Sequence, residues 1–266
     1  MRKLAAFLLL TVSTCCASGQ DTALRLIKSI PVKADFFTTD QLGNIYLIKG
    51  TDITKYDIIN GSERVFSNKL MGRITSVDAS DPLKIILFYS DLSQLVFLDN
   101  MMSMVGNPLT LETRGLEQVT LAAGSHDNGL WLYDRNTFQL LRLNRDMEKT
   151  QETGDLRQML RMDMRPNLLT EHNNHLYLNN PDVGILVFDI FGTYYKTIPL
   201  AGLKEFQIHD HSIYYLQDNK FCVFDMITLE KQTLPLPVKH FQQVRIEKQR
   251  IYLLGDDALS IYSFKE

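Results

Sequence analysis

The sequence has little cysteine, little net charge and, after its N-terminal segment, no long apolar run. Cys15 and Cys16 lie near the start and Cys222 stands alone, so the rest of the chain cannot form an internal disulfide. The formal net charge of −3 over 266 residues gives no long-range attraction to nucleic acid or anionic lipid. No later segment is apolar for long enough to cross a bilayer as a helix. We therefore expect neither a nucleic-acid-binding protein nor a chain with a transmembrane segment.

Motifs for catalysis are also missing. The sequence contains no G-x-S-x-G nucleophile elbow, and Cys222 lies between Phe221 and the apolar pair Val223 and Phe224, which is typical of a buried strand residue rather than a reactive thiol. Covalent catalysis therefore lacks a candidate nucleophile. We predict no catalytic residues, no cofactor and no enzyme activity.

The first residues have the three-part layout of a secretory leader. A basic start, Met1-Arg2-Lys3, precedes an apolar run over residues 4–12 and small residues over 13–19. We expect a signal peptide over residues 1–19 and a single domain over 20–266. Lipid attachment at Cys15 or Cys16 is the alternative, although Thr14 stands where such a site usually has Gly, Ala or Ser. The expected location is periplasmic or outer-membrane associated.

A unit of about 40 residues recurs six times along the chain. Each copy contains a short apolar strand, and these strands are centred on Tyr46, Ile86, Trp131, Tyr177, Tyr214 and Tyr252. A second strand follows and ends in a similar signature each time: Tyr56-Asp57, Leu98-Asp99, Leu143-Asn144, Phe188-Asp189, Phe224-Asp225 and Tyr262-Ser263. Further strands between the copies bring each unit to four, the pattern of a β-propeller blade.

The repeats predict an all-β fold, a six-bladed β-propeller. The sixth unit stops after three strands, whereas residues 24–32 form an apolar strand that has no place in the first unit. We predict that this N-terminal strand completes the last blade and closes the ring, which removes free sheet edges. Residues 144–164 do not fit the pattern, and we expect a long connection there between blades 3 and 4, with a helical turn within residues 155–162.

The stretch FTTDQLGNIYLIKGTDITKYD, residues 37–57, resembles a repeat of the six-bladed NHL and TolB-like propeller families. In such repeats an Asp and a Gly, here Asp40 and Gly43, shape the first hairpin turn. Blades 2 and 6 depart from this pattern at residues 81–84 and 247–250. The resemblance implies a fold that serves enzymes, ligand sensors and protein-binding scaffolds, so it does not select a function.

Acidic residues recur at the end of the innermost strand, and we interpret them as turn caps and therefore mainly as scaffold. They are Asp40, Asp78, Glu171, Asp210 and Glu247.

The candidate binding face is formed by the connections between blades and by the hairpins between second and third strands. Every connection contains a cation: Lys33, Arg73, Arg114, Arg165, Lys204 and Lys239. Every hairpin contains an acid: Asp52, Asp91, Asp134, Asp182, Asp218 and Asp256. We predict a charged face with basic positions near the axis, and aromatic side chains exposed in the hairpins, Tyr133 and the pair Phe88-Tyr89, as anchors for a partner. The simpler interpretation is that charged residues fill exposed loops everywhere.

Histidines occur in the first hairpins of blades 3, 4 and 5. They are His126, His172, His175, His209 and His211. With neighbouring carboxylates they could hold a metal ion, but the same loops have ordinary turn composition, and we predict no metal site.

These features favour an exported, non-catalytic propeller that is monomeric by itself and that mediates protein–protein interaction in a bacterial cell-envelope assembly. A propeller that binds a small ligand or a carbohydrate is the alternative, and behind it stands a metal-dependent hydrolase or lactonase-like enzyme.

Overall fold

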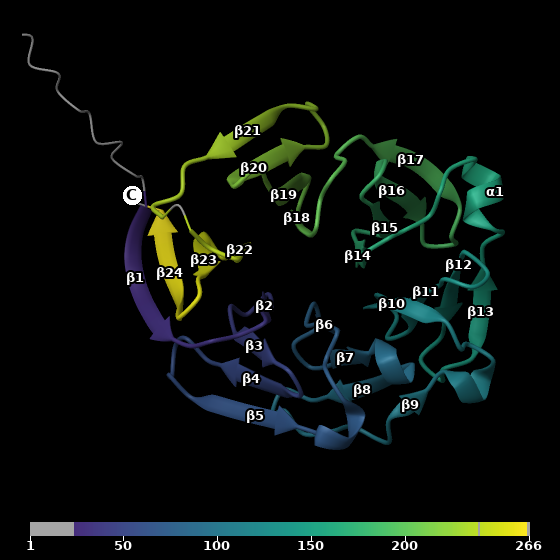
Figure 1. Ribbon diagram of the computed structural model, residues 1–266, viewed down its shortest axis with the longest axis horizontal. Coiled ribbons are helices and arrows are strands. Elements are labelled where there is room, and N and C mark those ends of the chain that lie inside the picture. Colours follow the sequence, from purple (N-terminus) through teal and green to yellow (C-terminus); the bar gives the residue numbers. More distant parts are fainter. Residues whose placement is uncertain (1–23, 239, 265–266) are drawn as a thin grey trace, which may run out of the picture.

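The computed structural model describes residues 24–238 and 240–264, so the predicted leader, with Cys15 and Cys16, and also Lys239 lie outside the described residues. The described chain forms six antiparallel sheets of four strands, which surround a common axis as the blades of a propeller (Figure 1). The predicted six-bladed, all-β fold is confirmed. Within these residues no helix has the length and apolar character to cross a membrane.

The first three blades follow each other along the chain, and each runs from its inner strand outward. Blade 1 is β2 (Phe36–Thr39), β3 (Ile45–Lys49), β4 (Asp52–Tyr56) and β5 (Glu63–Ser67). Blade 2 is β6 (Ser76–Asp78), β7 (Ile85–Tyr89), β8 (Gln94–Leu98) and β9 (Leu109–Thr110). Blade 3 is β10 (Val119–Gly124), β11 (Leu130–Asp134), β12 (Gln139–Leu143) and β13 (Lys149–Glu152).

The last three blades repeat this order, except that the sixth takes its outer strand from the start of the chain. Blade 4 is β14 (Leu168–His172), β15 (His175–Asn180), β16 (Gly184–Asp189) and β17 (Tyr194–Ile198). Blade 5 is β18 (Phe206–His209), β19 (Ser212–Gln217), β20 (Lys220–Asp225) and β21 (Lys231–Leu234). Blade 6 is β22 (Gln243–Glu247), β23 (Arg250–Leu254), β24 (Ala258–Phe264) and β1 (Leu24–Pro31).

Strand β1 closes the ring as predicted. It pairs antiparallel with β24, from Leu24 opposite Phe264 to Pro31 opposite Ala258. Because both ends of the described chain share one sheet, the propeller has no gap between its first and last blades (Figure 1).

Position within a blade explains the composition of each strand. The second strands lie between neighbouring blades and have apolar centres; all five residues of β7 are buried. Outer strands face solvent, and in β5 only Phe66 is partly buried. The innermost strands alternate, as in β22, where Val244 and Ile246 are buried and Arg245 and Glu247 are partly exposed.

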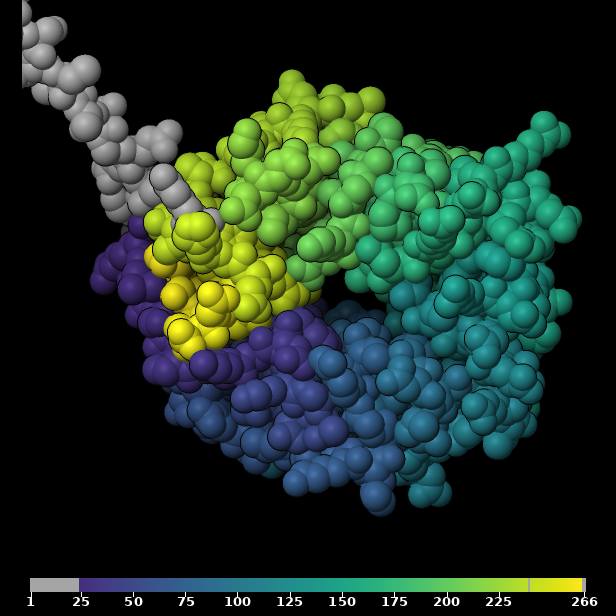
Figure 2. Space-filling model, in the orientation of Figure 1, coloured from purple at the N-terminus to yellow at the C-terminus, as the bar shows by residue number. Residues whose placement is uncertain are grey.

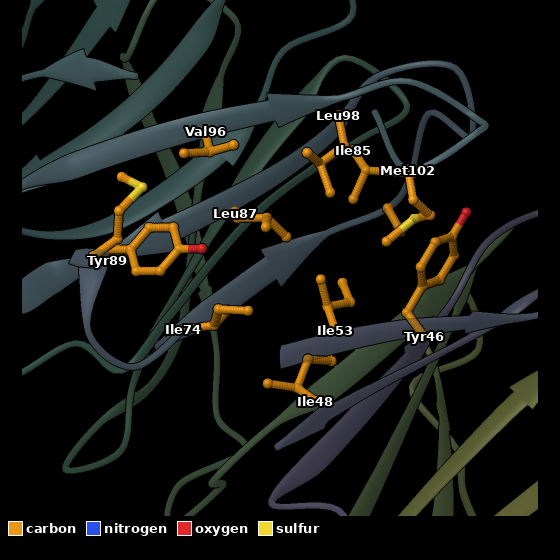
Figure 3. Packing of buried hydrophobic residues seen from close by; sticks show 12 residues of the cluster. Tyr46, Ile48, Ile53, Ile74, Ile85, Leu87, Tyr89, Val96, Leu98 and Met102 are labelled. Carbon is orange, nitrogen blue, oxygen red and sulfur yellow. The ribbon is translucent and has the colours of Figure 1, made fainter. Parts of the chain in front are cut away.

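The hydrophobic core is divided into six clusters, one at each boundary between blades. Figure 3 shows the cluster between blades 1 and 2, where Tyr46 and Ile48 of β3 meet Ile85 and Leu87 of β7. Each blade buries its two faces against two neighbours, so the ring is stable only when every blade is present. Cys222 is buried in one of these clusters, as expected.

The segment over residues 144–164 differs in part from the prediction. The expected helical turn is present as α1 (Leu156–Leu160), and the Asp155 side chain caps it by accepting from the N–H groups of Arg157 and Gln158. The first half is not connection, however, because it contains β13, the outer strand of blade 3. Its sequence, Lys-Thr-Gln-Glu, is polar because an outer strand is exposed to water. A strand without apolar residues cannot be predicted from apolar runs in the sequence.

Candidate functional site

The propeller has two faces of different construction. Hairpins between the first and second strands, and between the third and fourth strands, emerge on one face, which we call the hairpin face. Hairpins between the second and third strands emerge with the blade-to-blade connections on the other, which we call the loop face. Antiparallel order within every blade produces this division.

Two of the predicted loop-face cations form ion pairs with acids of neighbouring loops. Lys33 Nζ lies 3.0 Å from Asp257 Oδ1, and Arg73 Nη2 lies 3.1 Å from Asp35 Oδ2. Both pairs are open to solvent, so each contributes little to stability.

The other predicted cations lie in connections between blades as well. Arg114 Nη1 donates to the main-chain oxygen of Met147 at 2.6 Å, and the Arg165 and Lys204 residues are exposed. The lining of the central cavity includes none of these cations, nor Lys33 or Arg73.

The prediction that Tyr133 is exposed is wrong. Its side chain is 1% exposed and packs in the core cluster between blades 3 and 4 with Leu140, Leu156 and Met164. Burial raises the pKa of the Tyr133 hydroxyl to about 12. The connection that carries α1 covers the end of β11, so Tyr133 cannot anchor a partner.

The hairpin aromatics of blade 2 are buried too. Phe88 and Tyr89 both lie within core clusters at the boundaries of that blade. Both residues end a second strand, where neighbouring blades enclose the side chains on either side.

The acids of the loop-face hairpins shape turns. Asp134 is buried, and its Oδ1 accepts from the N–H groups of Asn136 and Thr137 at 2.7 and 3.3 Å. Asp52 Oδ1 accepts from the hydroxyls of Thr51 and Ser67. These bonds agree with the simpler interpretation that Asp stabilises turns here.

A polar cavity opens at the hairpin face and continues into the axial channel, and the space-filling view shows the hollow at the axis (Figure 2). The outer part has a volume of about 550 Å³ and the inner part about 380 Å³, and they share Gln41, Ser80, Glu171 and His172. All six inner strands contribute to the inner part. The histidine-bearing hairpins of blades 3 and 4 therefore meet at one cavity, as their positions in the repeat suggested.

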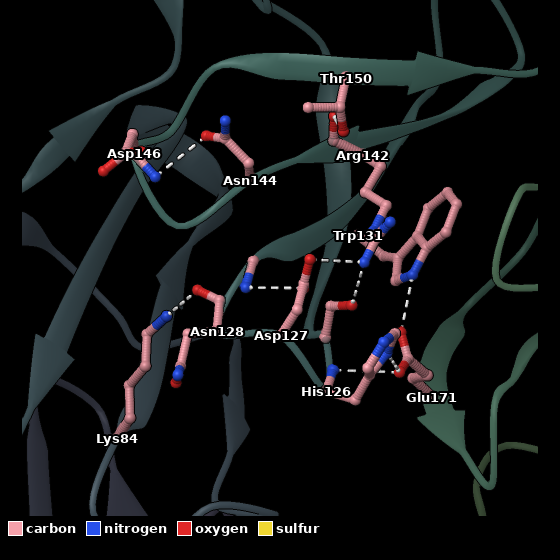
Figure 4. A network of polar contacts seen from close by, with 12 residues as sticks. Lys84, His126, Asp127, Asn128, Trp131, Arg142, Asn144, Asp146, Thr150 and Glu171 are labelled. Atoms are coloured by element: carbon pink, nitrogen blue, oxygen red, sulfur yellow. Dashed lines mark hydrogen bonds and ion pairs between the residues drawn. The ribbon is translucent and has the colours of Figure 1, made fainter.

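Glu171 is the centre of a polar network in the outer cavity (Figure 4). Its side chain is 6% exposed. Its Oε1 lies 2.6 Å from His126 Nδ1 and accepts from the His126 N–H at 3.0 Å, and its Oε2 accepts from Trp131 Nε1 at 2.8 Å. This carboxylate therefore joins blades 3 and 4 through three hydrogen bonds to the protein itself.

Residues 24–238 and 240–264 contain no group of three or more His, Cys, Asp or Glu side chains arranged to hold a metal ion. Two further histidines near the axis are partly buried, and this burial lowers the pKa of His172 and of His209. His209 Nε2 lies 2.9 Å from the Ile246 carbonyl oxygen across the next boundary.

Sequence reasoning missed Arg245 inside the channel, and it interpreted Asp78 and Glu247, which also line the inner cavity, only as turn caps. Arg245 lines the inner cavity, and its Nε donates to Thr39 Oγ1 at 3.4 Å. Burial lowers the pKa of Arg245 and raises that of Glu205 and of Glu247. The alternation of polar and apolar residues in β22 was the signal that could have found Arg245, because every second side chain of an inner strand faces the axis.

A second missed feature lies at the tips of the outer hairpins on the hairpin face. In each of these hairpins an Asp or Asn at the end of the third strand accepts a hydrogen bond from the N–H group two residues later. The residues that donate are Ile59, Met101, Asp146, Phe191 and Ile227. Four of these five tips therefore carry a large apolar side chain, and all four are exposed.

The exposed fractions of the tips are high. They are 83% for Ile59, 65% for Phe191, 69% for Ile227 and 50% for Met101. The sequence signal for these tips was an apolar residue two places after the Asp that ends the third strand.

Comparison with known proteins supports the fold. No protein-family profile matches the sequence, and no curated protein matches it. A chain of the mitotic checkpoint complex aligns with 8% identity and a TM-score of 0.67, over 100% of this chain and 99% of that one. Virginiamycin B lyase from Staphylococcus aureus aligns with 12% identity and a TM-score of 0.57, over 85% and 79%. BamB from Moraxella catarrhalis aligns with 12% identity and a TM-score of 0.56, over 91% and 98%.

At these identities the likeness concerns architecture alone, and the neighbours differ in what they do, since one is a lyase and another belongs to a multiprotein complex. The structure has six four-stranded sheets with one core cluster per boundary, and β1 closes the ring. The alignments agree with this architecture. The chain is a six-bladed β-propeller.

Proposed function

We propose that this chain is an exported, non-catalytic interaction propeller of the cell envelope, which binds a protein partner through its loop face. The observation that carries the proposal is the display of large apolar side chains on hydrogen-bonded turns. Leu70 is 94% exposed, and Asn68 fixes its turn by accepting from the Leu70 N–H at 3.1 Å.

A second apolar side chain is exposed on the loop face. Leu92 is 40% exposed and lies on a short helical turn in the hairpin between the second and third strands of blade 2. Leu70 lies in the connection that leads into the same blade, close in sequence to the exposed cation Arg73. Apolar side chains with a charged rim are typical of protein interfaces.

The best-placed carboxylates support a role without catalysis. Glu171 is bound to three donors, and Glu205 Oε2 accepts from Gln243 Nε2 at 2.7 Å. A general acid or base must reach a substrate proton, whereas these groups hold neighbouring blades together. The similar architecture of BamB from Moraxella catarrhalis and of a chain in the mitotic checkpoint complex supports a propeller that acts in an assembly.

The test is photocrosslinking in living cells with the crosslinking amino acid at Leu70 of the full chain. The control places it at Val65, which is exposed on the outer strand β5. We expect a stoichiometric protein adduct at Leu70, recovered with the envelope fraction, and none at Val65. Recovery of the chain without any adduct from the soluble fraction would contradict the proposal.

The second candidate is a propeller that binds a small polar ligand, and the polar cavity favours it. Lys84, Asp81, Ser125 and Asn174 are among its lining residues. Sugars and small anions that raise the melting temperature, with no adduct at Leu70, would support this function in place of the first.

A further inference from the structure

The four apolar tips lie at equivalent positions in four different blades. Ile59, Met101, Phe191 and Ile227 each follow the turn-forming Asp by two residues. Equivalent hairpins of a propeller end at similar heights along the axis, so these side chains approach one plane. They are separated around the rim instead of being joined in one patch, since each belongs to its own blade.

The described chain begins at the same face. In blades 1 to 5 the third strand runs toward the hairpin face, where the outer hairpin follows it. In blade 6 the third strand is β24, and Leu24, the first residue of β1, pairs with Phe264 near its end. Strand β1 starts beside the end of β24 (Figure 1), so Leu24, the first described residue, lies at the hairpin face where the sixth outer hairpin would be.

The length of the preceding chain limits how far this face can lie from a membrane. Cys16, one of the two candidate lipid-attachment residues, precedes Leu24 by only a few residues. At roughly 3.5 Å per residue, a fully extended segment of this length spans about 28 Å. A lipid at Cys15 or Cys16 would therefore hold Leu24, and with it the hairpin-face end of blade 6, within roughly 30 Å of the bilayer.

A bilayer fits separated tips better than a protein surface does. A protein partner would have to match four points spaced around a ring, whereas the apolar phase of a membrane is continuous and planar, and all tips can enter it together. One acyl chain gives only weak attachment, and a second membrane-binding element makes it stable. Inserted side chains would supply that element.

We propose that the hairpin face lies on a lipid bilayer, with Ile59, Met101, Phe191 and Ile227 inserted among the lipids and the loop face directed away from it. This inference rests on the proposed function, because it assumes export to the envelope, and it takes lipid attachment at Cys15 or Cys16 instead of cleavage after residue 19. It assigns the two faces to two partners, a membrane for one and a protein for the other.

The experiment uses the full chain with a single introduced cysteine, labelled with the polarity-sensitive fluorophore NBD. Phe191→Cys and Ile227→Cys report on the hairpin face, and Leu70→Cys reports on the loop face as the matched control. Cys15 and Cys16 are replaced by Ser in every labelled protein, Cys222 is buried, and the chain without an introduced cysteine gives the background labelling. Each protein is mixed with vesicles of phosphatidylethanolamine and phosphatidylglycerol, with and without brominated acyl chains.

We expect the NBD emission at positions 191 and 227 to rise and shift to the blue with vesicles and to be quenched by bromine, while position 70 is unchanged. A Phe191→Ser, Ile227→Ser variant should bind vesicles about tenfold more weakly than the unsubstituted chain or Leu70→Ser, equivalent to about 1.4 kcal/mol.

Three results would overturn the inference. The first is an equal response at positions 70 and 191, and the second is no response at either face. The third is a change at positions 191 and 227 in native envelopes but not in pure lipid, which would mean that a protein covers the tips. In the third case photocrosslinking at Leu70 would still give a protein adduct. Failure of this inference is therefore distinguishable from failure of the proposed function.

Discussion

The charged side chains of the two faces of the propeller have different partners. On the loop face the charged side chains meet each other in solvent, as Arg73 and Asp35 do. On the hairpin face they cross the boundaries between blades: Lys55 Nζ donates to the Asn100 carbonyl oxygen at 3.0 Å, and the buried Glu171 binds groups of the preceding blade. The loop face has contacts across boundaries as well, such as Asn167 Nδ2 donating to the Leu203 carbonyl oxygen at 3.2 Å. The contrast therefore lies between the exposed ion pairs of the loop face, which contribute little to the fold, and the buried carboxylate of the hairpin face, which joins two blades.

The largest expected effect comes from removing the central group of the hairpin-face network. Glu171→Ala should lower the free energy of unfolding by about 3 kcal/mol, because the buried Trp131 Nε1–H and the groups of His126 lose a charged acceptor. Urea denaturation of the full chain measures this change.

The matched control for this change is Glu152→Ala, which removes an acid of the neighbouring blade 3 whose partner Lys149 is exposed on the same strand. Its cost should be below about 0.5 kcal/mol. An equal loss in the free energy of unfolding for the two variants would mean that the buried carboxylate contributes no more to stability than the exposed one.

The partly buried histidines at the hairpin end of the channel predict a dependence on pH. Because burial lowers the pKa of His172 and His209, the unfolded chain binds more protons once the pH falls below about 6.5, and stability is lost as the pH continues downward. The pKa values of Glu205 and Glu247 are raised by burial, which acts with the opposite sign. The comparison is therefore made with a His172→Asn, His209→Gln variant by urea denaturation across this range, and the variant should lose less stability on acidification. A loss identical to that of the unsubstituted chain would exclude the histidines.

Removal of a turn cap should have a smaller effect. Asp189→Ala deletes the acceptor for the N–H groups of Phe191 and Thr193, at 2.9 and 2.8 Å, and should cost about 1 kcal/mol. The control is Asp182→Ala, an exposed acid in the loop-face hairpin of the same blade, with an expected cost under about 0.5 kcal/mol. Thermal unfolding compares the pair, and a greater loss for Asp182→Ala would reverse the comparison between faces.

The smallest effect is expected on the loop face itself. Arg73→Ala removes a side chain that is 71% exposed and should change the free energy of unfolding by less than about 0.5 kcal/mol. Urea denaturation at low and high salt checks this value. A loss above about 1 kcal/mol would show that this ion pair contributes to the fold as the hairpin-face contacts do.

The blade pattern could be predicted because it depends on burial that is visible in short apolar strands. The apolar triplets around Tyr46, Ile86, Trp131, Tyr177, Tyr214 and Tyr252 all fall in the second strands, which neighbouring blades cover on both sides. Closure followed from a count of strands at the two ends of the chain.

The site residues were harder to predict because exposure depends on distant chain segments. Tyr133 belongs to a hairpin that looks open in the sequence, yet the connection with α1 covers it. Arg245 faces the axis because it lies on an innermost strand, and the sequence alone does not say that six such strands converge. The tips, such as Phe191, resemble ordinary turn residues until the topology places four of them on one face.

Closure by β1 has a consequence for the order in which the chain folds. The first strand of the described chain pairs with its last strand, Leu24 with Phe264, so the final contact of the ring joins residues separated by nearly the whole described sequence. Contacts of such separation form slowly because a long loop must close first. The sheet of blade 6 therefore stays incomplete until β24 has been synthesised.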